Sequence, residues 1–262
     1  MEKLSVLKVG GKVLEDPKES ALVLSNFAQL PGLKIMVHGG GKTASQLAKR
    51  MDIPVQMIDG RRITDAAMLE IVLMVYGGLM NKSVVALLQA RGINAIGLTG
   101  ADMNVIQAHK RPVGQIDFGF VGDVDGVDAQ ALQTLLQAGM VPVMAPLTHD
   151  GAGQMLNTNA DTIASSVAQA MAEQYEVHLV FCFDRPGVLT DPTDDSSLIP
   201  QITPAAYAQH KKAGRIAGGM LPKLDNAFAA LNQGVHRIYL CQPQAVAQLG
   251  QADFVGTTLM PA

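Results

Sequence analysis

Two clusters of glycine, each placed directly after a short apolar run, are the first residues of this chain that could do chemistry. Gly10 and Gly11 follow the run 4–9, and Gly39, Gly40 and Gly41 follow the run 35–38. A strand that ends in glycines lets the next backbone N–H groups approach an anion, and a helix that follows adds its positive end. The two clusters therefore predict a site that handles more than one anionic group.

Two lysines could serve such a site. Lys8 lies inside the first apolar run, where an unpaired ammonium group would be costly to bury. Lys223 follows Pro222, which we expect at the first position of a helix. Because a cation in the first turn opposes the helix dipole, Lys223 is expected either to face a phosphate or to be an exposed surface lysine.

A polar segment that ends in Asp161 leads into another expected helix, and it also contains Asn157 and Asn159. Asp161 could be the N-cap of that helix. Alternatively, its carboxylate could lie close to Lys8 and Lys223 and hold both ammonium groups, which would offset the cost of burying them. The two asparagines add amide donors and acceptors at the same strand-to-helix crossing.

Several other motifs favour a structural interpretation. Residues 41–43 resemble the end of a phosphate-binding P-loop, but Met36 stands where that motif requires glycine. His38 is expected to be structural, and residues 194–197 are expected to form a solvated turn rather than a metal site. The two cysteines, Cys182 and Cys241, form no CxxC motif, so neither a disulfide framework nor a zinc site is indicated.

The elements that must position these residues follow the order strand, loop, helix, repeated. This alternation predicts an α/β fold with a mostly parallel sheet. Buried strands are expected at residues 5–9, 34–38, 95–98, 141–145, 177–183 and 237–240, and helices around residues 43–50, 66–89, 129–137, 162–174 and 223–233.

Two segments interrupt this alternation and are predicted to be β-hairpins. In the first, strands 55–58 and 61–64 flank Asp59-Gly60, a pair favoured in two-residue turns. The second is expected over residues 104–120. Hairpins at the strand ends of an α/β sheet can cover the ligand crevice as lids, although surface decoration would give the same pattern.

The composition argues against several classes of function. The chain has 262 residues, 48% hydrophobic and 16% charged, with a net charge of −3. No long basic stretch is present, so neither nucleic acid nor an anionic membrane is expected as a partner. We expect no signal peptide, because a strand begins almost at residue 1, and no apolar run of membrane-spanning length. These features predict a cytoplasmic location.

Five motifs in one order resemble the amino-acid kinase family, and the resemblance runs from about residue 4 to residue 258. Within that family the chain is similar to the kinases of N-acylated glutamate. The resemblance implies a three-layer αβα sandwich as a single domain, in which residues 1–174 form the acyl-glutamate-binding and dimerisation lobe and residues 175–262 the nucleotide-binding lobe. The motifs are Lys8-x-Gly-Gly11, His38-Gly-Gly-Gly41, Asp59-Gly-x-Arg-x-Thr64, Asn157-x-Asn-Ala-Asp161 and Gly218-Gly-Met-x-Pro-Lys223.

The resemblance also implies a reaction, the transfer of the ATP γ-phosphoryl group to the γ-carboxylate of N-acetyl-L-glutamate, in arginine or ornithine biosynthesis. A carboxylate is already ionised at neutral pH, so this reaction needs no general base. It needs charge stabilisation from lysines, backbone N–H groups and Mg²⁺. The Mg²⁺ ion is expected to be held mainly by ATP phosphates and water, and no protein ligand is assigned to it.

The roles of single residues follow from the same resemblance. Lys8 and Lys223 are expected to be catalytic and to contact the transferring phosphoryl group, while Asp161 orients both. Asp184 and Gly187 are expected near the nucleotide. The remaining positions are Gly10, Gly11 and Gly40 as backbone donors around the phosphoryl group, and Gly40, Gly41, Arg62 and Asn157 in the substrate site, where Arg62 pairs with the α-carboxylate and Asn157 binds the amide region.

The chain departs from the family pattern in three places. Residues 182–187 read Cys-Phe-Asp-Arg-Pro-Gly where Leu-Thr-Asp-Val-Pro-Gly is usual, so a hydroxyl near the nucleotide is lost and Arg185 is gained. Residues 239–242 replace a customary Asp-Gly-Arg turn. Arg61 precedes Arg62, and it could pair with the extra carboxylate of an N-succinyl substrate or be solvated, because neighbouring strand residues face opposite sides.

The apolar segment 66–89 is predicted to be buried, either within the fold or in a subunit contact. In the family this region forms a dimer interface, and relatives that arginine inhibits carry an additional N-terminal helix. The resemblance therefore implies a homodimer that is insensitive to arginine. The alternatives are another activity of the family or a catalytically silent nucleotide-binding regulatory module.

Overall fold

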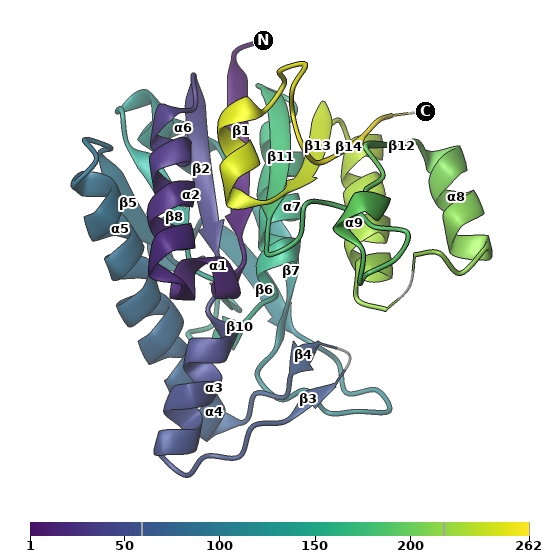
Figure 1. Ribbon diagram of the computed structural model, residues 1–262. Coiled ribbons are helices and arrows are strands. Elements are labelled where there is room, and N and C mark those ends of the chain that lie inside the picture. The colour runs from purple at the N-terminus through teal and green to yellow at the C-terminus, as the bar shows by residue number, and fades with distance from the viewer. Residues whose placement is uncertain (59, 217, 262) are drawn as a thin grey trace.

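The computed structural model describes residues 1–58, 60–216 and 218–261, and its centre is an eight-stranded sheet with helices on both faces (Figure 1). Neighbouring strands run parallel, except for one antiparallel pair, β13 with β14. The predicted αβα sandwich around a mostly parallel sheet is confirmed. In spatial order the strands are β12 (Gln201–Ile202), β14 (Thr257–Leu259), β13 (Arg237–Cys241), β11 (Glu176–Cys182), β1 (Lys3–Val9), β2 (Leu33–His38), β8 (Val141–Met144) and β5 (Ala95–Leu98).

The central strands are apolar throughout because helices bury both of their faces. In β1, Leu4 and Val6 belong to one core cluster, and Leu7 and Val9 belong to the other. Lys8 alternates with Leu7 and Val9, so it lies on the face of Leu4 and Val6. That face is covered by α6 (Ala129–Gln137), α7 (Ala160–Met171), α8 (Pro204–Lys212) and α9 (Met220–Asn232). The opposite face is covered by α1 (Gly11–Glu15), α2 (Pro17–Gln29), α5 (Asn81–Gln89) and the 3₁₀ helix η4 (Pro243–Gln248).

All six predicted strands are present, each within two residues of its expected ends. Three helices, α1, α2 and α8, were not predicted, although Asp16 caps α2 by accepting hydrogen bonds from the N–H groups of Lys18 and Glu19. The expectation that Pro222 begins a helix was wrong, because α9 begins at Met220 and Pro222 is its third residue. Two short 3₁₀ helices, η2 (Asp102–Asn104) and η3 (Asp195–Ser197), lie in loops, and Asp194 caps η3 as a turn residue would.

Residues 66–89 form the continuous helical stretch that was predicted, but with a wide central turn. It consists of α4 (Ala66–Val72), the π-helix η1 (Leu73–Met80) and α5. The expectation that no apolar run reaches membrane-spanning length was wrong, since these 24 residues contain an 18-residue window that is long and apolar enough to pass that test by length and composition. Part of this apolar character is explained by packing in the fold, because Met68, Ile71 and Val72 are buried in a core cluster that includes Ala44 of α3 (Gly41–Arg50).

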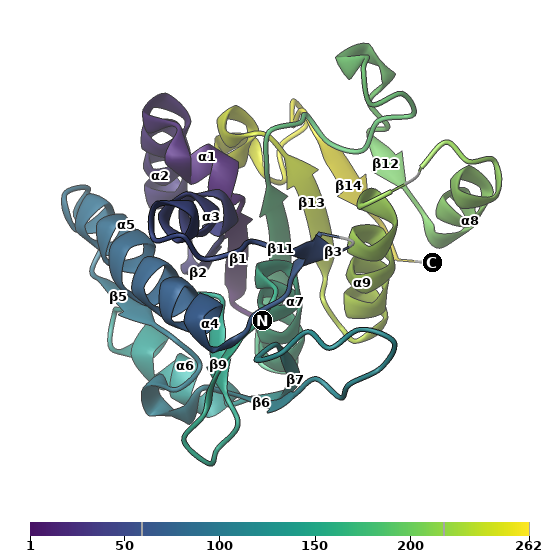
Figure 2. The same cartoon turned by 90° about the horizontal axis from the view of Figure 1, so that it is seen from below.

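The two predicted hairpins lie together below the carboxyl ends of the central strands (Figures 1 and 2). The first is confirmed as β3 (Met57–Ile58) paired with β4 (Arg61–Arg62), while Asp59 of its turn lies outside the described residues. The second was wrong in its return strand, because β6 (Ile106–Lys110) pairs with β7 (Gly122–Val127) and residues 111–121 form a loop. With β9 (Leu147–His149) and β10 (Met155–Asn157), these two strands form a small second sheet.

Candidate active site

One carboxylate holds two lysine ammonium groups near the carboxyl end of β1. Lys8 Nζ lies 2.8 Å from Asp161 Oδ1, and Lys223 Nζ lies 2.5 Å from Asp161 Oδ2. The three residues come from β1, the first turn of α7 and the first turn of α9. The two lysine side chains are only 14% and 16% exposed, so the interpretation of Lys223 as a surface lysine was wrong.

Asp161 is not the N-cap of α7, contrary to one of the two expectations. Asn159 is the N-cap of α7, because its side-chain oxygen accepts hydrogen bonds from the N–H groups of Asp161 and Thr162. The Asp161 carboxylate is therefore free of the helix end and turns to the two lysines. In the first turn of α7 it is also favoured by the helix dipole.

The charges of this cluster stabilise one another. Burial raises the pKa of Asp161, but the ammonium groups of Lys8 and Lys223 outweigh it and hold that pKa well below 3.8. Burial lowers the pKa of Lys223, and the Asp161 carboxylate opposes that shift. Lys223 Nζ also lies 4.7 Å from the centre of the Phe181 ring, whose face attracts a cation. The cluster carries a net positive charge and would attract an anion.

The two glycine clusters lie against each other at the ends of β1 and β2. A Cβ atom on Gly11 would come within 3.1 Å of the backbone nitrogen of Gly40, and one on Gly40 would come within 3.0 Å of the Tyr76 ring. Glycine is needed here for close packing. The Gly10 N–H already donates a hydrogen bond to the Cys182 carbonyl oxygen at 2.9 Å, which leaves Gly11 and Gly40 as the better backbone donors to a ligand.

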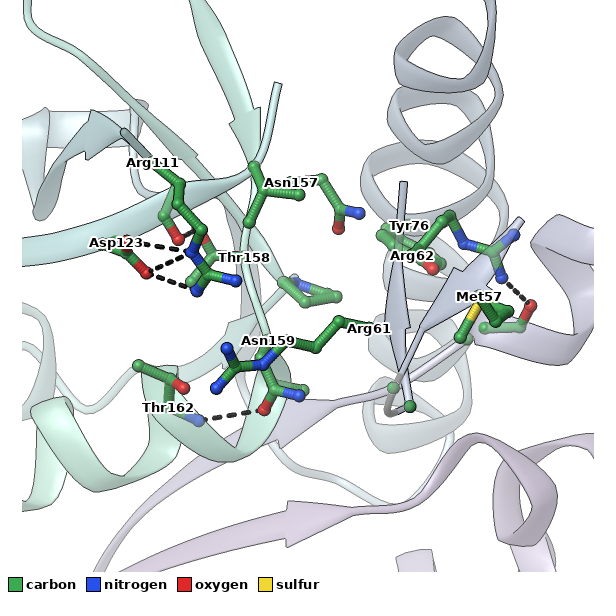
Figure 3. Close-up of a pocket in the computed structure, with 18 residues that line it drawn as sticks. Met57, Arg61, Arg62, Tyr76, Arg111, Asp123, Asn157, Thr158, Asn159 and Thr162 are labelled. Atoms are coloured by element: carbon green, nitrogen blue, oxygen red, sulfur yellow. Dashed lines mark hydrogen bonds and ion pairs between the residues drawn. The ribbon is translucent and has the colours of Figure 1, made fainter. Parts of the chain in front are cut away.

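A cavity of about 190 Å³ opens next to these glycines (Figure 3). Four residues predicted for the substrate site line it: Gly40, Gly41, Arg62 and Asn157. Arg62 is buried and donates hydrogen bonds to the Gly41 carbonyl oxygen at 2.7 Å and to Ser45 Oγ at 2.8 Å. Asn157 Nδ2 donates to Thr64 Oγ1 at 2.9 Å. We call this space the substrate cavity.

The far wall of the substrate cavity carries residues that the sequence did not reveal. Arg111, in the loop 111–121, forms a two-point ion pair with Asp123 of β7, and Tyr76 of η1 closes another side. The hydrogen bonds from Arg111 lower the pKa of Asp123. Arg61 is exposed and lines the same cavity (Figure 3). Among the described residues, the three arginines and one carboxylate in its wall favour an anionic ligand.

A second cavity, of about 310 Å³, lies between residues 185–192 and 214–220. Gly187 contributes to its lining, and a Cβ atom there would come within 2.6 Å of Thr257 Oγ1. Asp184, just before this cavity, is paired with Lys12 of α1 at 2.9 Å. We call this space the nucleotide cavity, since it adjoins the positions at which a nucleotide was expected.

His38 is structural, as expected. It is fully buried at the end of β2, its Nδ1–H donates to the Gly39 carbonyl oxygen at 3.0 Å, and Asn81 Nδ2 donates to its Nε2 at 3.2 Å. Burial lowers the pKa of His38 to about 4, although the hydrogen bond to Gly39 opposes this. The side chain is therefore neutral at physiological pH.

Comparisons with known proteins agree with this geometry. The sequence profile of the amino acid kinase family matches residues 3–242. Acetylglutamate kinase of Bacteroides thetaiotaomicron is 55% identical over 94% of this chain and 95% of its own length, and that of Cytophaga hutchinsonii is 51% identical over 99% of both chains. A crystal structure of a Streptococcus mutans protein superposes with a TM-score of 0.80 at 25% identity, covering 98% of both chains. On these matches and on its fold, the chain belongs to the amino acid kinase family.

Proposed function

We propose that this chain transfers the γ-phosphoryl group of ATP to the γ-carboxylate of N-acetyl-L-glutamate, and so forms an acyl phosphate in arginine or ornithine biosynthesis. The observation that carries the proposal is the Lys8–Asp161–Lys223 cluster. Ala160 and Thr162, the neighbours of Asp161, line the substrate cavity, and Met220, three residues before Lys223 on α9, lines the nucleotide cavity. Relatives at 51–55% identity that are named acetylglutamate kinase support this choice of acceptor.

The residues around the cluster suit a reaction between two anions. The acceptor carboxylate attacks the γ-phosphorus atom, the bond from that atom to the β-phosphate oxygen breaks, and ADP leaves. We propose that Lys8 and Lys223 neutralise the charge that repels the two groups and stabilise the transferring phosphoryl group. Asp161 then fixes the two ammonium groups in position, and the N–H groups of Gly11 and Gly40 add two hydrogen bonds.

The acceptor is held, in this proposal, by the substrate cavity. Arg62 offers a guanidinium group to the α-carboxylate, and Asn157 offers its side-chain amide to the acyl-amide region. Arg61 lies in the wall of the same cavity, where it could meet a further carboxylate. The acetyl group carries no such carboxylate, so Arg61 makes N-succinyl-L-glutamate the comparison substrate of choice.

Magnesium bound to ATP would neutralise phosphate charge in this reaction. Asp161 is already paired with two ammonium groups and Asp184 with Lys12. The Asp161 carboxylate is therefore not free to hold a metal ion, whereas the Asp184–Lys12 pair is exposed and weak. We infer that Mg²⁺ is held mainly by ATP phosphates and water.

We further propose two lobes in one domain, a homodimer and a cytoplasmic location. All described residues that line the substrate cavity fall within 1–174, and all that line the nucleotide cavity fall within 175–262, which supports the division into acyl-glutamate and nucleotide lobes. The dimer is supported by exposed apolar side chains on the helical stretch 66–89, including Met74 and Leu79.

The test is acyl phosphate formation, trapped with hydroxylamine, from ATP, Mg²⁺ and each of N-acetyl-, N-succinyl- and free glutamate. We expect N-acetyl-L-glutamate to be the preferred acceptor. Preference for the succinyl compound would overturn the acetyl assignment, and Arg61→Ala would then be expected to abolish that preference. No product from any acceptor would overturn the proposed reaction.

Two lysine variants separate an enzyme from a silent nucleotide-binding module. Lys8→Ala and Lys223→Ala are expected to lower kcat by at least about a hundredfold, the size of effect that one charge-stabilising donor has in other enzymes. Lys49→Ala, which changes an exposed lysine at the end of α3, is the matched control and should retain full activity. Circular dichroism must show that all three variants are folded, and full activity in either active-site variant would contradict the proposed role.

A further inference from the structure

The nucleotide cavity has two guanidinium groups at its edge. Arg185 and Arg215 line it, and Leu189, Ile216 and Met220 provide an apolar surface. None of the described residues that line the cavity is acidic. An apolar surface next to concentrated positive charge fits a ligand with a flat, weakly polar ring system at one end and several negative charges at the other.

Neither guanidinium group is tightly engaged. The neighbour of Arg185 is Asp195, at 3.5 Å, and the two side chains are 50% and 62% exposed. An ion pair of that length and exposure contributes little. Arg215 is exposed, and no ion pair of its side chain occurs within the described part of the chain. Both groups are therefore available to an incoming anion.

The position of the cavity relative to the Lys8–Asp161–Lys223 cluster indicates which part of a ligand meets these arginines. Met220 lines the cavity, and Lys223 lies three residues later on α9, so the two share one face of that helix. Arg185 follows Asp184, which is held by Lys12 of α1 next to Gly11. A ligand in the cavity that presents its terminal phosphate to Lys223 would have its other phosphates near the Asp184–Arg185 segment.

We propose that Arg185, assisted by Arg215, binds the polyphosphate of the nucleotide and so acts as an additional determinant of ATP affinity. This inference rests on the proposed function, because it assigns the nucleotide to this cavity. A guanidinium group suits the task since it offers several N–H donors in one plane to phosphate oxygens. It also explains the departure at position 185, where the family pattern has an uncharged residue.

The test is calorimetric binding of ADP and of adenosine to the wild-type chain and to Arg185→Met, without acceptor substrate. Loss of a charge-assisted contact to phosphate is expected to weaken ADP binding about tenfold and to change adenosine binding less than about twofold. Arg215→Met is expected to act in the same direction. In turnover assays with N-acetyl-L-glutamate, Arg185→Met should raise the KM for ATP by a similar factor and leave the KM for the acceptor unchanged.

Arg50→Met, which changes an exposed arginine at the end of α3, is the matched control and should bind ADP as the wild type does. If Arg185→Met binds ADP as tightly as the wild type, or loses ADP and adenosine affinity equally, the polyphosphate contact is excluded. If the wild-type chain binds no adenine nucleotide, the proposed function fails as well, so the two failures can be told apart.

Discussion

At the scale of single residues, the fold keeps basic side chains in its interior in three different ways. Lys8 and Lys223 share the Asp161 carboxylate. Lys34 donates to three backbone carbonyl oxygens. His38 is neutral, with both ring nitrogens hydrogen-bonded. The first arrangement leaves a net positive charge, which suits the proposed binding of a phosphoryl group, whereas the other two leave the basic group hydrogen-bonded within the fold.

His38 gives a prediction about pH. Its pKa is lowered by burial from 6.5 to about 4, so between these values the unfolded chain binds a proton that the folded chain does not. Stability must therefore fall as pH decreases from 6.5 to 4, by up to about 3 kcal/mol from this residue. His178, whose pKa burial also lowers to about 4, acts in the same direction. The measurement is urea unfolding of the wild type from pH 7 to pH 4.5.

His38→Gln separates the contribution of this residue. Glutamine cannot take up a proton in this range, so the variant should lose less stability than the wild type between pH 7 and pH 4.5, whatever its stability at pH 7. His109→Gln, which changes an exposed histidine on β6, is expected to leave the decline in place. An equally steep decline in His38→Gln would show that His38 does not cause it.

The residues that sequence reasoning found are those whose partners are implied by local patterns. A lysine in an apolar strand needs an anion, and the segment that ends in Asp161 offers one. The grouping of Lys8, Asp161 and Lys223 could therefore be predicted from the sequence alone. Arg111, Asp123 and Tyr76 could not be found in this way. They reach the substrate cavity from a loop, the second sheet and the π-helix, and their meeting depends on tertiary packing.

At the scale of elements, strands were the easiest to predict because burial on both faces leaves an unbroken apolar run. The helices α1, α2 and α8 leave a weaker pattern, because α1 is short and α8 buries only Tyr207. The helix α2 was missed even though Asp16 and Pro17 are strong start signals. The return strand of the second hairpin was misplaced because β7 contains two glycines and two aspartates among its six residues, which disguise it as a turn. The π-helix η1 was not predicted, because its residues continue the apolar pattern of the flanking helices without a distinct local signal.

The end of α2 gives a prediction at this scale. Lys34 Nζ, from β2, donates to the carbonyl oxygens of Phe27, Ala28 and Leu30 at 3.3, 2.9 and 2.6 Å, and so satisfies the last turn of the helix. Lys34→Met would leave these carbonyl groups without that donor. We expect it to lower the free energy of unfolding by about 1–3 kcal/mol, as measured by urea denaturation.

Lys18→Met is the control for this prediction, because it removes an exposed lysine from the first turn of the same helix. A cation there opposes the helix dipole, so its loss should change stability by no more than about 0.5 kcal/mol in either direction. Equal stability of Lys34→Met and the wild type would show that water replaces the lysine at no cost.

At the scale of the whole molecule, the lysine cluster lies where two halves of one sheet meet. β11 of the proposed nucleotide lobe pairs directly with β1 of the proposed acyl-glutamate lobe along seven residue pairs. The lobes are therefore joined by backbone hydrogen bonds rather than by a flexible linker. The hairpin β3–β4 and the loop 111–121 are also joined by backbone hydrogen bonds, because Thr64, two residues after β4, bonds to Phe118 and Phe120. Both segments contribute residues to the wall of the substrate cavity.

The apolar helical stretch 66–89 gives the prediction for the assembly. Met74, Leu79 and Leu87 are 49%, 57% and 43% exposed. In agreement with this, only 39% of the most apolar 18-residue window of the stretch is buried inside the fold. Apolar side chains gathered on one helix are usually covered by a partner. We expect the wild type to sediment as a dimer of about 55 kDa, twice the chain mass of 27.7 kDa. Leu79→Lys should shift it toward the monomer, because a charge would be buried in the contact.

Leu22→Lys, on α2, changes a comparably exposed leucine away from this helix and should remain dimeric. A monomeric or hexameric wild type, or a Leu79→Lys variant that stays fully dimeric, would place the subunit contact elsewhere.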